Sequence, residues 1–402
     1  MLIRVAARNA LRNGRRTAYT VLAVAFGLLC LIVFQALKVG LHAEMVRSTV
    51  ELDAGLVQIH GVGYEPNLAS LKPLPEPEKV VKGLINAGAT GWALRTRVPA
   101  LLLAKEKSST VLLTGIDPER EPSVTFVSAR ITKGAYPDRS GGVLLPENLA
   151  QPLGVGVGDE VSLMAQDASG RAVVRKFRIG GLYRTALQSF DRTHLFIEGG
   201  ALREFLRAEN VYTEAVAVNE PGDEATLAAQ LRASLDPAKF QVRTWKEAAP
   251  DVDQLIRLND STMGLLIAIV FAIVAMGIVN TMSMAVFERF REVGVMLALG
   301  ARPRTVFTLI VLESTAIGVL SAALGTLLGV AACGYLAKYG VDLTSLTSSN
   351  EYFATSHILK ARLTLPDLAW ENGLTILTAS LAGVLPAAKA VRLEVVEALG
   401  HV

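Results

Sequence analysis

Charged side chains alternate along a short segment that joins two strongly apolar stretches of the chain. The alternation starts with Glu288 and Arg289 and resumes at Arg291 and Glu292 after one aromatic residue. Carboxylates and guanidinium groups in this arrangement form ion pairs and charge-assisted hydrogen bonds with another protein, and they break no covalent bond themselves. The segment therefore predicts a docking element for a soluble partner. Its residues are Phe287, Glu288, Arg289, Phe290, Arg291, Glu292 and Gly294.

Residue types that perform catalysis or bind metals are present, but they are not grouped. The five histidines are scattered, and none has the spacing of a metal site. The glycine-rich run 154–158 precedes a predicted strand, whereas a dinucleotide-binding loop must open a helix. No serine or cysteine lies in a nucleophile motif. We therefore predict no catalytic residue, no metal ligand and no cofactor-binding residue in this chain.

Glu313 is a polar residue inside an apolar block. A carboxylate within a membrane span is costly unless it is paired or hydrated. Glu313 lies near one end of its block. One interpretation is that its side chain extends to the membrane surface, and the other is a structural or gating role.

The elements that must position these residues are apolar blocks long enough to cross a bilayer. The chain is 51% hydrophobic, with a mean hydropathy of +0.39. The fourth block is the weakest, because Glu371 and Asn372 stand at its start, and a re-entrant or interfacial segment is the alternative. A cleavable signal peptide is the alternative for the first block, but that block exceeds the roughly 7–15 residues of a signal core. The predicted transmembrane helices are 17–37, 263–286, 306–333 and 370–388.

Basic residues set the predicted orientation, because they accumulate on the cytoplasmic side of a membrane. Arginines at helical spacing in 1–16 predict a cytoplasmic amphipathic helix, or simply an orienting cluster of charge. The segment 287–305 and the tail 389–402 are then also cytoplasmic, and the loop 334–369 lies outside. The net charge of +3 is too small to predict nucleic-acid binding.

Residues 38–262 form a large external region with mixed helical and strand patterns. Its first and last parts have a helical period and are predicted to extend the first two membrane helices as a stalk. Two strand–helix patterns, starting near residues 56 and 213, are predicted to share one sheet, with a strand-rich insert at about 117–206. The predicted fold class is membrane α-helical with four transmembrane helices and an α+β extracytoplasmic domain between helices one and two.

Small residues in the third membrane helix predict close helix packing. Gly325 and Gly329 form a GxxxG pair, and Gly318 lies two turns earlier. Such spacing lets two helix backbones approach each other.

Several motifs together resemble the FtsX/MacB-like permeases of ABC transporters. The resemblance rests on 288–294, on Leu299-Gly300-Ala301 and on Leu312-Glu313-Ser314, with a C-terminal signature at 386–399. The order of one span, a large external domain and three further spans also agrees. The resemblance implies a permease that transmits mechanical force and pairs with a second permease subunit, as a homodimer or heterodimer. It also implies a cytoplasmic ABC ATPase dimer that binds ATP and Mg²⁺ and receives the segment Phe287–Arg291.

Within this family, the segment 242–250 resembles lipoprotein-releasing permeases of the LolC/LolE type. A hook that recruits the periplasmic carrier in the LolC type would fall between Leu163 and Phe177, where only a short turn is present. The chain therefore resembles the hookless LolE type or a MacB-type efflux permease with a membrane-fusion adaptor. An FtsX-like signal transducer acting on an external hydrolase is a further alternative.

The resemblance implies a bacterial inner-membrane protein with cytoplasmic termini and a periplasmic domain. In the lipoprotein interpretation, acylated proteins leave the outer leaflet of that membrane through an apolar face of the stalk and pass to a carrier. Acyl chains move between apolar surroundings at low cost. The residues predicted to line this path are Val39, Met45, Val46, Leu255, Ile256 and Met263.

Overall fold

The computed structural model describes residues 14–64, 71–138, 141–185, 190–219, 222–288, 290–342 and 358–391. The chain forms two compact units. The helical unit comprises Met1–His42, Ile256–Asp342 and Ile358–Val402, and the sheet unit comprises Ala43–Leu255 and Leu343–His357. The predicted N-terminal helix 1–16 lies almost wholly outside the described residues, and so does the tail after residue 391.

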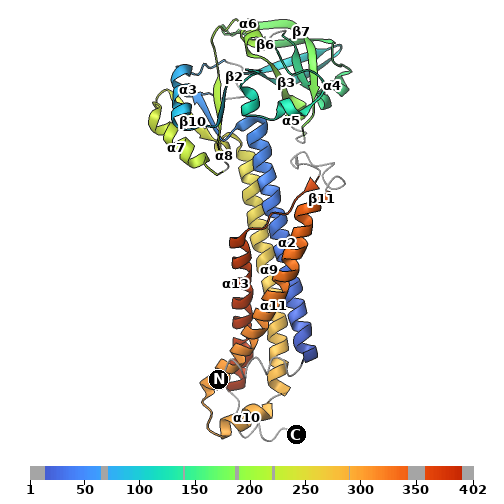
Figure 1. Cartoon of the computed structure of the whole chain (residues 1–402), viewed down its shortest axis with the longest axis vertical. Helices are drawn as coiled ribbons and strands as arrows, with labels where there is room; N and C mark the ends of the chain where they lie inside the picture. The colour runs from blue at the N-terminus through green and yellow to red at the C-terminus, as the bar shows by residue number, and fades with distance from the viewer. Residues whose placement is uncertain are drawn as a thin grey trace. The chain divides into compact units, whose positions relative to one another are not determined.

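Long apolar helices build the helical unit (Figure 1). In the described part of the chain, four helical segments are long and apolar enough to cross a membrane, in agreement with the sequence prediction. The fourth segment, Leu365–Val391, consists of α13 and the short helix α14. A small pair of strands, β11 (Val341–Asp342) and β12 (Ile358–Leu359), lies between the third and fourth segments along the chain. The helices are α2 (Gly14–Thr49), α9 (Pro250–Glu288), α11 (Pro303–Tyr339), α13 (Leu365–Ala382) and α14 (Val384–Val391).

Helices α2 and α9 are longer than the spans predicted for them. They contain 36 and 39 residues, and the second is roughly 58 Å long at 1.5 Å per residue. The α2 helix continues into a π-helical segment, η1 (Val50–Ala54). The two helices are tied together within the helical unit, because Lys38 forms an ion pair with Asp260 at 2.9 Å and Thr20 hydrogen-bonds Thr281 at 3.2 Å.

The fourth membrane helix departs from its predicted bounds of 370–388. It begins at Leu365, where the Thr364 hydroxyl accepts a hydrogen bond from the backbone of Asp367, and it is interrupted at Gly383. Glu371, which made this span the weakest of the four in the sequence, is only 4% exposed. The capping threonine seven residues earlier starts the helix.

Three glycines of α11 allow two other helices to approach it closely. A Cβ atom on Gly325 would lie 2.8 Å from the backbone oxygen of Ala25 in α2. One turn later, a Cβ on Gly329 would lie 3.0 Å from the Ile32 side chain. On another side of the helix, a Cβ on Gly318 would lie 2.6 Å from the Cβ of Ala379 in α13. These positions pack α11 against both α2 and α13.

Substituting alanine at Gly318 or at Gly325 is expected to destabilise the helical unit by about 1–3 kcal/mol, because each added methyl group overlaps a neighbouring helix. Gly334 in the same helix has no neighbouring atom within 4 Å of a Cβ position, so Gly334→Ala is the matched control. Heating the detergent-solubilised variants and following loss of the intact peak by size exclusion measures the effect. If Gly318→Ala and Gly334→Ala lost the intact peak at the same midpoint temperature, this result would contradict the close packing of α11 on α13.

The sheet unit begins with an antiparallel sheet in the order β10-β1-β9-β2. Two helices accompany it and contribute buried residues such as Leu84 and Leu231 to the core. The prediction that two distant strand–helix patterns share one sheet is therefore confirmed. The elements are β1 (Val57–Gly61), α3 (Pro77–Asn86), β2 (Gly91–Ala104), β9 (Glu214–Val218), α7 (Glu224–Ser234), β10 (Phe240–Thr244) and α8 (Trp245–Ala248).

The long strand β2 continues into a second group of strands in the order β2-β3-β8-β5-β7-β4, and β6 pairs with both β2 and β7. The β6–β7 turn is short, since Gln166 pairs with Ala172. The strands are β3 (Lys107–Ile116), β4 (Ile131–Gly134), β5 (Val143–Pro146), β6 (Glu160–Gln166), β7 (Ala172–Tyr183) and β8 (His194–Glu198). Short helices connect them: η2 (Glu121–Ser123), η3 (Val127–Arg130), α4 (Glu147–Leu153), α5 (Phe190–Thr193) and α6 (Gly199–Phe205).

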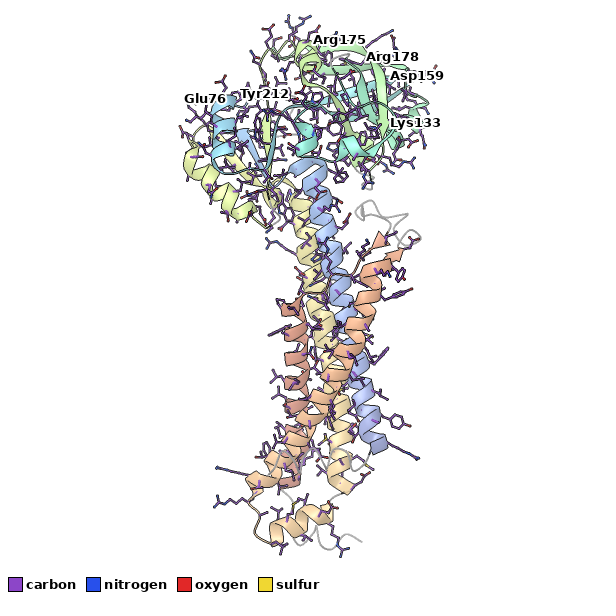
Figure 2. The ribbon with its side chains drawn as sticks, in the orientation of Figure 1. Glu76, Lys133, Asp159, Arg175, Arg178 and Tyr212 are labelled. Atoms are coloured by element: carbon purple, nitrogen blue, oxygen red, sulfur yellow. The ribbon has the colours of Figure 1, made fainter. Side chains whose placement is uncertain are left out.

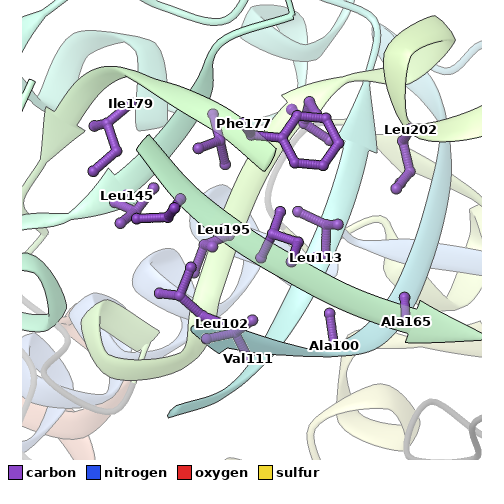
Figure 3. Close-up of a cluster of buried hydrophobic side chains, with 14 of the residues drawn as sticks. Ala100, Leu102, Val111, Leu113, Leu145, Ala165, Phe177, Ile179, Leu195 and Leu202 are labelled. Atoms are coloured by element: carbon purple, nitrogen blue, oxygen red, sulfur yellow. The ribbon is translucent and has the colours of Figure 1, made fainter. Parts of the chain in front are cut away.

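A hydrophobic core fills this second group of strands. Leu102, Leu113 and Leu195 are fully buried and come from three strands, and Phe177 packs edge-to-face on Phe205 (Figure 3). The strand-rich part was predicted to begin at about residue 117, but it already includes the far halves of β2 and β3. Strand β2 is one continuous strand, so its sequence does not mark where it passes from the first sheet into the second group of strands.

Candidate coupling site

The predicted docking segment forms a short amphipathic helix between two membrane helices. After α9 ends at Glu288, helix α10 spans Phe290–Ala298, and α11 begins with Pro303 in its first turn. Gly300 closes α10 with a φ of 90°, a backbone conformation that residues with a Cβ rarely adopt. Glycine at this position therefore permits the reversal from α10 into α11.

One side of α10 is anchored in the helical unit. Val293 is 6% exposed and belongs to a hydrophobic cluster that includes Met282 and Val286 of α9 and Val306 of α11. Gly294 is also buried. Burial of this side fixes α10 to the ends of both membrane helices, so a force on α10 acts on both of them.

The other side of α10 and the end of α9 form an exposed surface, which we call the coupling face. Leu299 is 83% exposed, Phe287 is 58% exposed and Val295 is 41% exposed. Charged Glu288, Arg291 and Glu292 are exposed beside them. Apolar anchors surrounded by charges are typical of protein-binding surfaces. Arg289 and the side chain of Phe290 lie outside what the structure describes.

Glu313 is close to the docking segment, which the sequence did not indicate. Its side chain is 8% exposed, and it lines a cavity of about 40 Å³ together with Glu292 of α10 and Met282 of α9. The carboxylate is therefore packed at the junction of α9, α10 and α11. Glu313 therefore connects the docking segment to α11, the third membrane helix, through the cavity that it shares with Glu292.

The residues predicted to line a path for lipid chains differ in exposure. Met45 is 7% exposed and Met263 is 8% exposed, so both are buried within the single chain. Partly buried positions are Val39, Val46, Leu255 and Ile256. The strongly exposed apolar residues of α9 are Leu258, Leu265, Leu266, Ile269, Ile273, Met276, Met284 and Phe287.

The sheet unit contains a buried cluster of charges that was not predicted from the sequence. Arg95 is 1% exposed and lies 2.6 Å from the Glu121 carboxylate and 3.4 Å from Glu214. Arg97 lies 3.1 Å from Glu214 and forms a bidentate pair with Asp53. Asp53 belongs to the π-helical segment that continues α2, and its backbone oxygen accepts a hydrogen bond from Arg95 at 2.7 Å. This charge cluster therefore holds the end of the α2–η1 helix on strand β2.

Charge neutralisation explains how the cluster is tolerated. Burial disfavours the charged guanidinium of Arg95, but the carboxylates of Glu121 and then Glu214 outweigh this effect and raise its pKa. The pKa of Arg97 is raised in the same way, with Asp53 as the strongest partner. A signal was present in the sequence, because residues 95 and 97 lie on the same face of a strand, and two arginines there need acidic partners when buried.

His194 beside this cluster makes the stability of the sheet unit depend on pH. Burial, assisted by the charge of Arg97 and opposed by that of Asp53, lowers the pKa of His194 to about 4. The unfolded chain binds the proton near pH 6.5, so stability is complete above that pH and is lost as the pH falls toward 4. Since the imidazole is partly exposed, we expect a loss of about 2 kcal/mol between pH 7.5 and pH 4.5.

Urea unfolding of wild type and His194→Gln at both pH values measures this effect. The variant is expected to lose about 2 kcal/mol less stability than wild type between these two pH values, whatever its stability at pH 7.5. Asp191 acts with the opposite sign, because burial raises its pKa to about 6, and the comparison between the two proteins cancels its contribution. Parallel pH profiles would rule out His194 as the group responsible.

Comparison with known proteins identifies the family. Residues 17–234, more than half of the chain, match the family described as MacB-like periplasmic core domain, and residues 264–395 match FtsX-like permease C-terminal. The lipoprotein-releasing system transmembrane protein LolC of Xylella fastidiosa strain Temecula1 is 21% identical over 313 residues, which cover 75% of each chain.

A second relative is the macrolide export ATP-binding/permease protein MacB of Wolinella succinogenes. It is 27% identical over 160 residues, which cover 40% of this chain and 22% of that protein. Among solved structures, the periplasmic region of MacB from Actinobacillus actinomycetemcomitans covers 52% of this chain and 95% of its own, with 12% identity and a TM-score of 0.34. From the two family matches and the four membrane helices, this chain is a multi-pass membrane protein that belongs to the FtsX/MacB-like family of ABC transporter permeases.

Proposed function

We propose that this chain is the permease subunit of a mechanotransmission transporter, in which ATP is hydrolysed by a separate cytoplasmic ATPase that docks on the coupling face. The observation that carries the proposal lies within the helical unit, where the buried side of α10 packs against the ends of α9 and α11. A continuous helix transmits displacement along its axis, and the ion pair of Lys38 with Asp260 joins α2 to the same motion.

The proposed cargo is a lipoprotein, taken from the outer leaflet of the inner membrane and passed to a periplasmic carrier. The similarity to a lipoprotein-releasing protein along three quarters of both chains supports this cargo. The exposed apolar face of α9 offers a surface for acyl chains, whose exposure to water costs about 0.8 kcal/mol per CH₂ group. In this proposal both termini lie in the cytoplasm, the sheet unit lies in the periplasm, and a second permease subunit completes the transporter.

Efflux of MacB type is the second candidate, and the similarity to a macrolide export ATP-binding/permease protein over 40% of this chain supports it. The tight β6–β7 turn, in which the Asp167 carboxylate accepts hydrogen bonds from the backbone of Ser169 and Arg171, fits this candidate and the hookless LolE type equally. In the case of efflux the partner is a membrane-fusion adaptor rather than a lipoprotein carrier.

Purification of the intact complex followed by reconstitution in proteoliposomes tests both candidates. Copurification of an ABC ATPase is expected, and ATP hydrolysis should rise with an acylated protein but not with the same protein lacking its acyl chains. Equal stimulation by the unacylated protein would favour efflux. Absence of any ATPase from the complex would contradict the permease mechanism itself.

A further inference from the structure

A cavity of about 530 Å³ opens in the sheet unit where β2 passes from the first sheet into the second group of strands. Trp92 and Leu94 of β2 line it on one side, together with Tyr212, which is labelled in Figure 2. The turn after β3 and the start of α6 line the other side. The volume is within the range of about 300–1,000 Å³ that is usual for ligand sites. The permease mechanism proposed above does not use this cavity.

The two aromatic rings of the cavity already have cations against them. The guanidinium of Arg120 lies 4.0 Å from the centre of the Trp92 ring, and that of Arg203 lies 5.0 Å from the centre of Tyr212. These distances are those of cation–π contacts. Both rings are thus positioned so that a positive group can rest on them.

Carboxylates outnumber the guanidinium groups in the lining. Asp117, Glu119 and Glu198 contribute three acidic groups, against the two arginines. Within the residues that the structure describes, no salt bridge pairs Asp117, Glu119 or Glu198 with a basic side chain. Asp117 and Glu198 instead accept backbone hydrogen bonds through single oxygens. The cavity therefore has an excess of negative charge, which favours a cationic occupant.

We propose that this cavity binds a basic side chain, lysine or arginine, of an extracytoplasmic polypeptide. Such a side chain has an apolar stem and a charged head. The stem fits the apolar surface of Trp92, Leu94 and Tyr212, and the head reaches Asp117 and Glu119. A polypeptide suits an open cavity between two sheets better than a small cation does, because its main chain passes outside while one side chain enters. Binding there connects the partner to both sheets at once.

This inference extends the proposed function, since it places a contact for cargo or carrier on the sheet unit. Its test requires no ATPase, so its failure is separate from failure of the transport mechanism. The probe is a capped five-residue peptide with one central arginine, fluorescently labelled and titrated with the full chain in detergent micelles while anisotropy is recorded. Control peptides have citrulline, which keeps the shape without the charge, or glutamate at the central position.

Three variants are expected to change the affinity for the arginine peptide in three different ways. Asp117→Asn combined with Glu119→Gln is expected to weaken binding of the arginine peptide by about tenfold, as two lost charge contacts at a partly exposed site would do. Arg120→Gln is expected to strengthen binding by about threefold, because it removes a competing cation and uncovers Trp92. Glu106→Gln combined with Glu209→Gln removes the same charge at exposed positions outside the cavity and is expected to leave affinity unchanged.

The increase expected for Arg120→Gln is decisive, because general damage to the fold would weaken binding rather than strengthen it. Binding of the arginine peptide in preference to both control peptides, with these three responses, supports the proposal. Equal binding of the citrulline peptide, preference for glutamate, or weaker binding by Arg120→Gln would overturn it.

Discussion

Replacing Arg95 with methionine is expected to lower the free energy of unfolding of the sheet unit by about 3–5 kcal/mol. Methionine fills a similar volume but leaves the Glu121 carboxylate, 0% exposed, without its cation, and Glu214, 1% exposed, with Arg97 alone. The backbone oxygen of Asp53 would also lose a hydrogen bond. The cost is that of unpaired buried charge, which exceeds the cost of losing one favourable contact.

Hydrogen exchange followed by mass spectrometry is the appropriate measurement, because a membrane protein with two units does not unfold in one step. Amides of β2 and β9 are expected to exchange at least about 100-fold faster in Arg95→Met, since 1.4 kcal/mol corresponds to a factor of ten. Arg175→Met is the matched control, because Arg175 is 46% exposed and pairs with exposed Glu204. Similar exchange in the two variants would show that the charge cluster does not hold the sheet unit together.

Introducing a charge on the coupling face is expected to abolish stimulation of the partner ATPase by cargo. Leu299 is 83% exposed in the single chain, so Leu299→Asp costs little folding stability. Burying an unpaired carboxylate in an interface is very costly, and loss of an apolar anchor alone typically costs at least about 2 kcal/mol of binding. We therefore expect the affinity for the ATPase to fall by about 30-fold or more.

Copurification and ATP hydrolysis in proteoliposomes measure this second effect. Val62→Asp is the matched control, because Val62 is an apolar residue of the sheet unit that is 45% exposed. Alanine at Glu288 and Arg291 is expected to produce a smaller loss, since exposed charges at the edge of an interface contribute less than its apolar centre. Full stimulation in Leu299→Asp, with normal assembly, would mean that the ATPase docks elsewhere.

The membrane helices could be predicted from the sequence because their signals are local. Long apolar blocks identify α2, α9 and α11, and the helical period next to them identifies their extensions. The exposed face of α10 follows from side-chain spacing along one helix. The short β6–β7 turn could also be predicted from the sequence, since a turn of this kind depends on neighbouring residues only.

Features that depend on contacts between distant residues could not be predicted. Arg95 and Glu214 are separated by more than a hundred residues, and nothing near either one indicates its partner. Glu313 lines a cavity with Glu292 only because α10 folds back against α11. The burial of Glu371 in the fourth helix also depends on packing, and the sequence did not indicate it.

An ATPase can reach the coupling face only if that face lies in the cytoplasm. Labelling of single cysteines in intact cells with a membrane-impermeant maleimide measures on which side it lies. The background has Cys30→Ala and Cys333→Ala, and the reporters are Leu299→Cys on the coupling face and Glu106→Cys in the exposed β2–β3 turn. We expect position 106 to react in intact cells and position 299 to react only after permeabilisation. Reaction of position 299 in intact cells would place the coupling face outside the cell, where no cytoplasmic ATPase could dock on it.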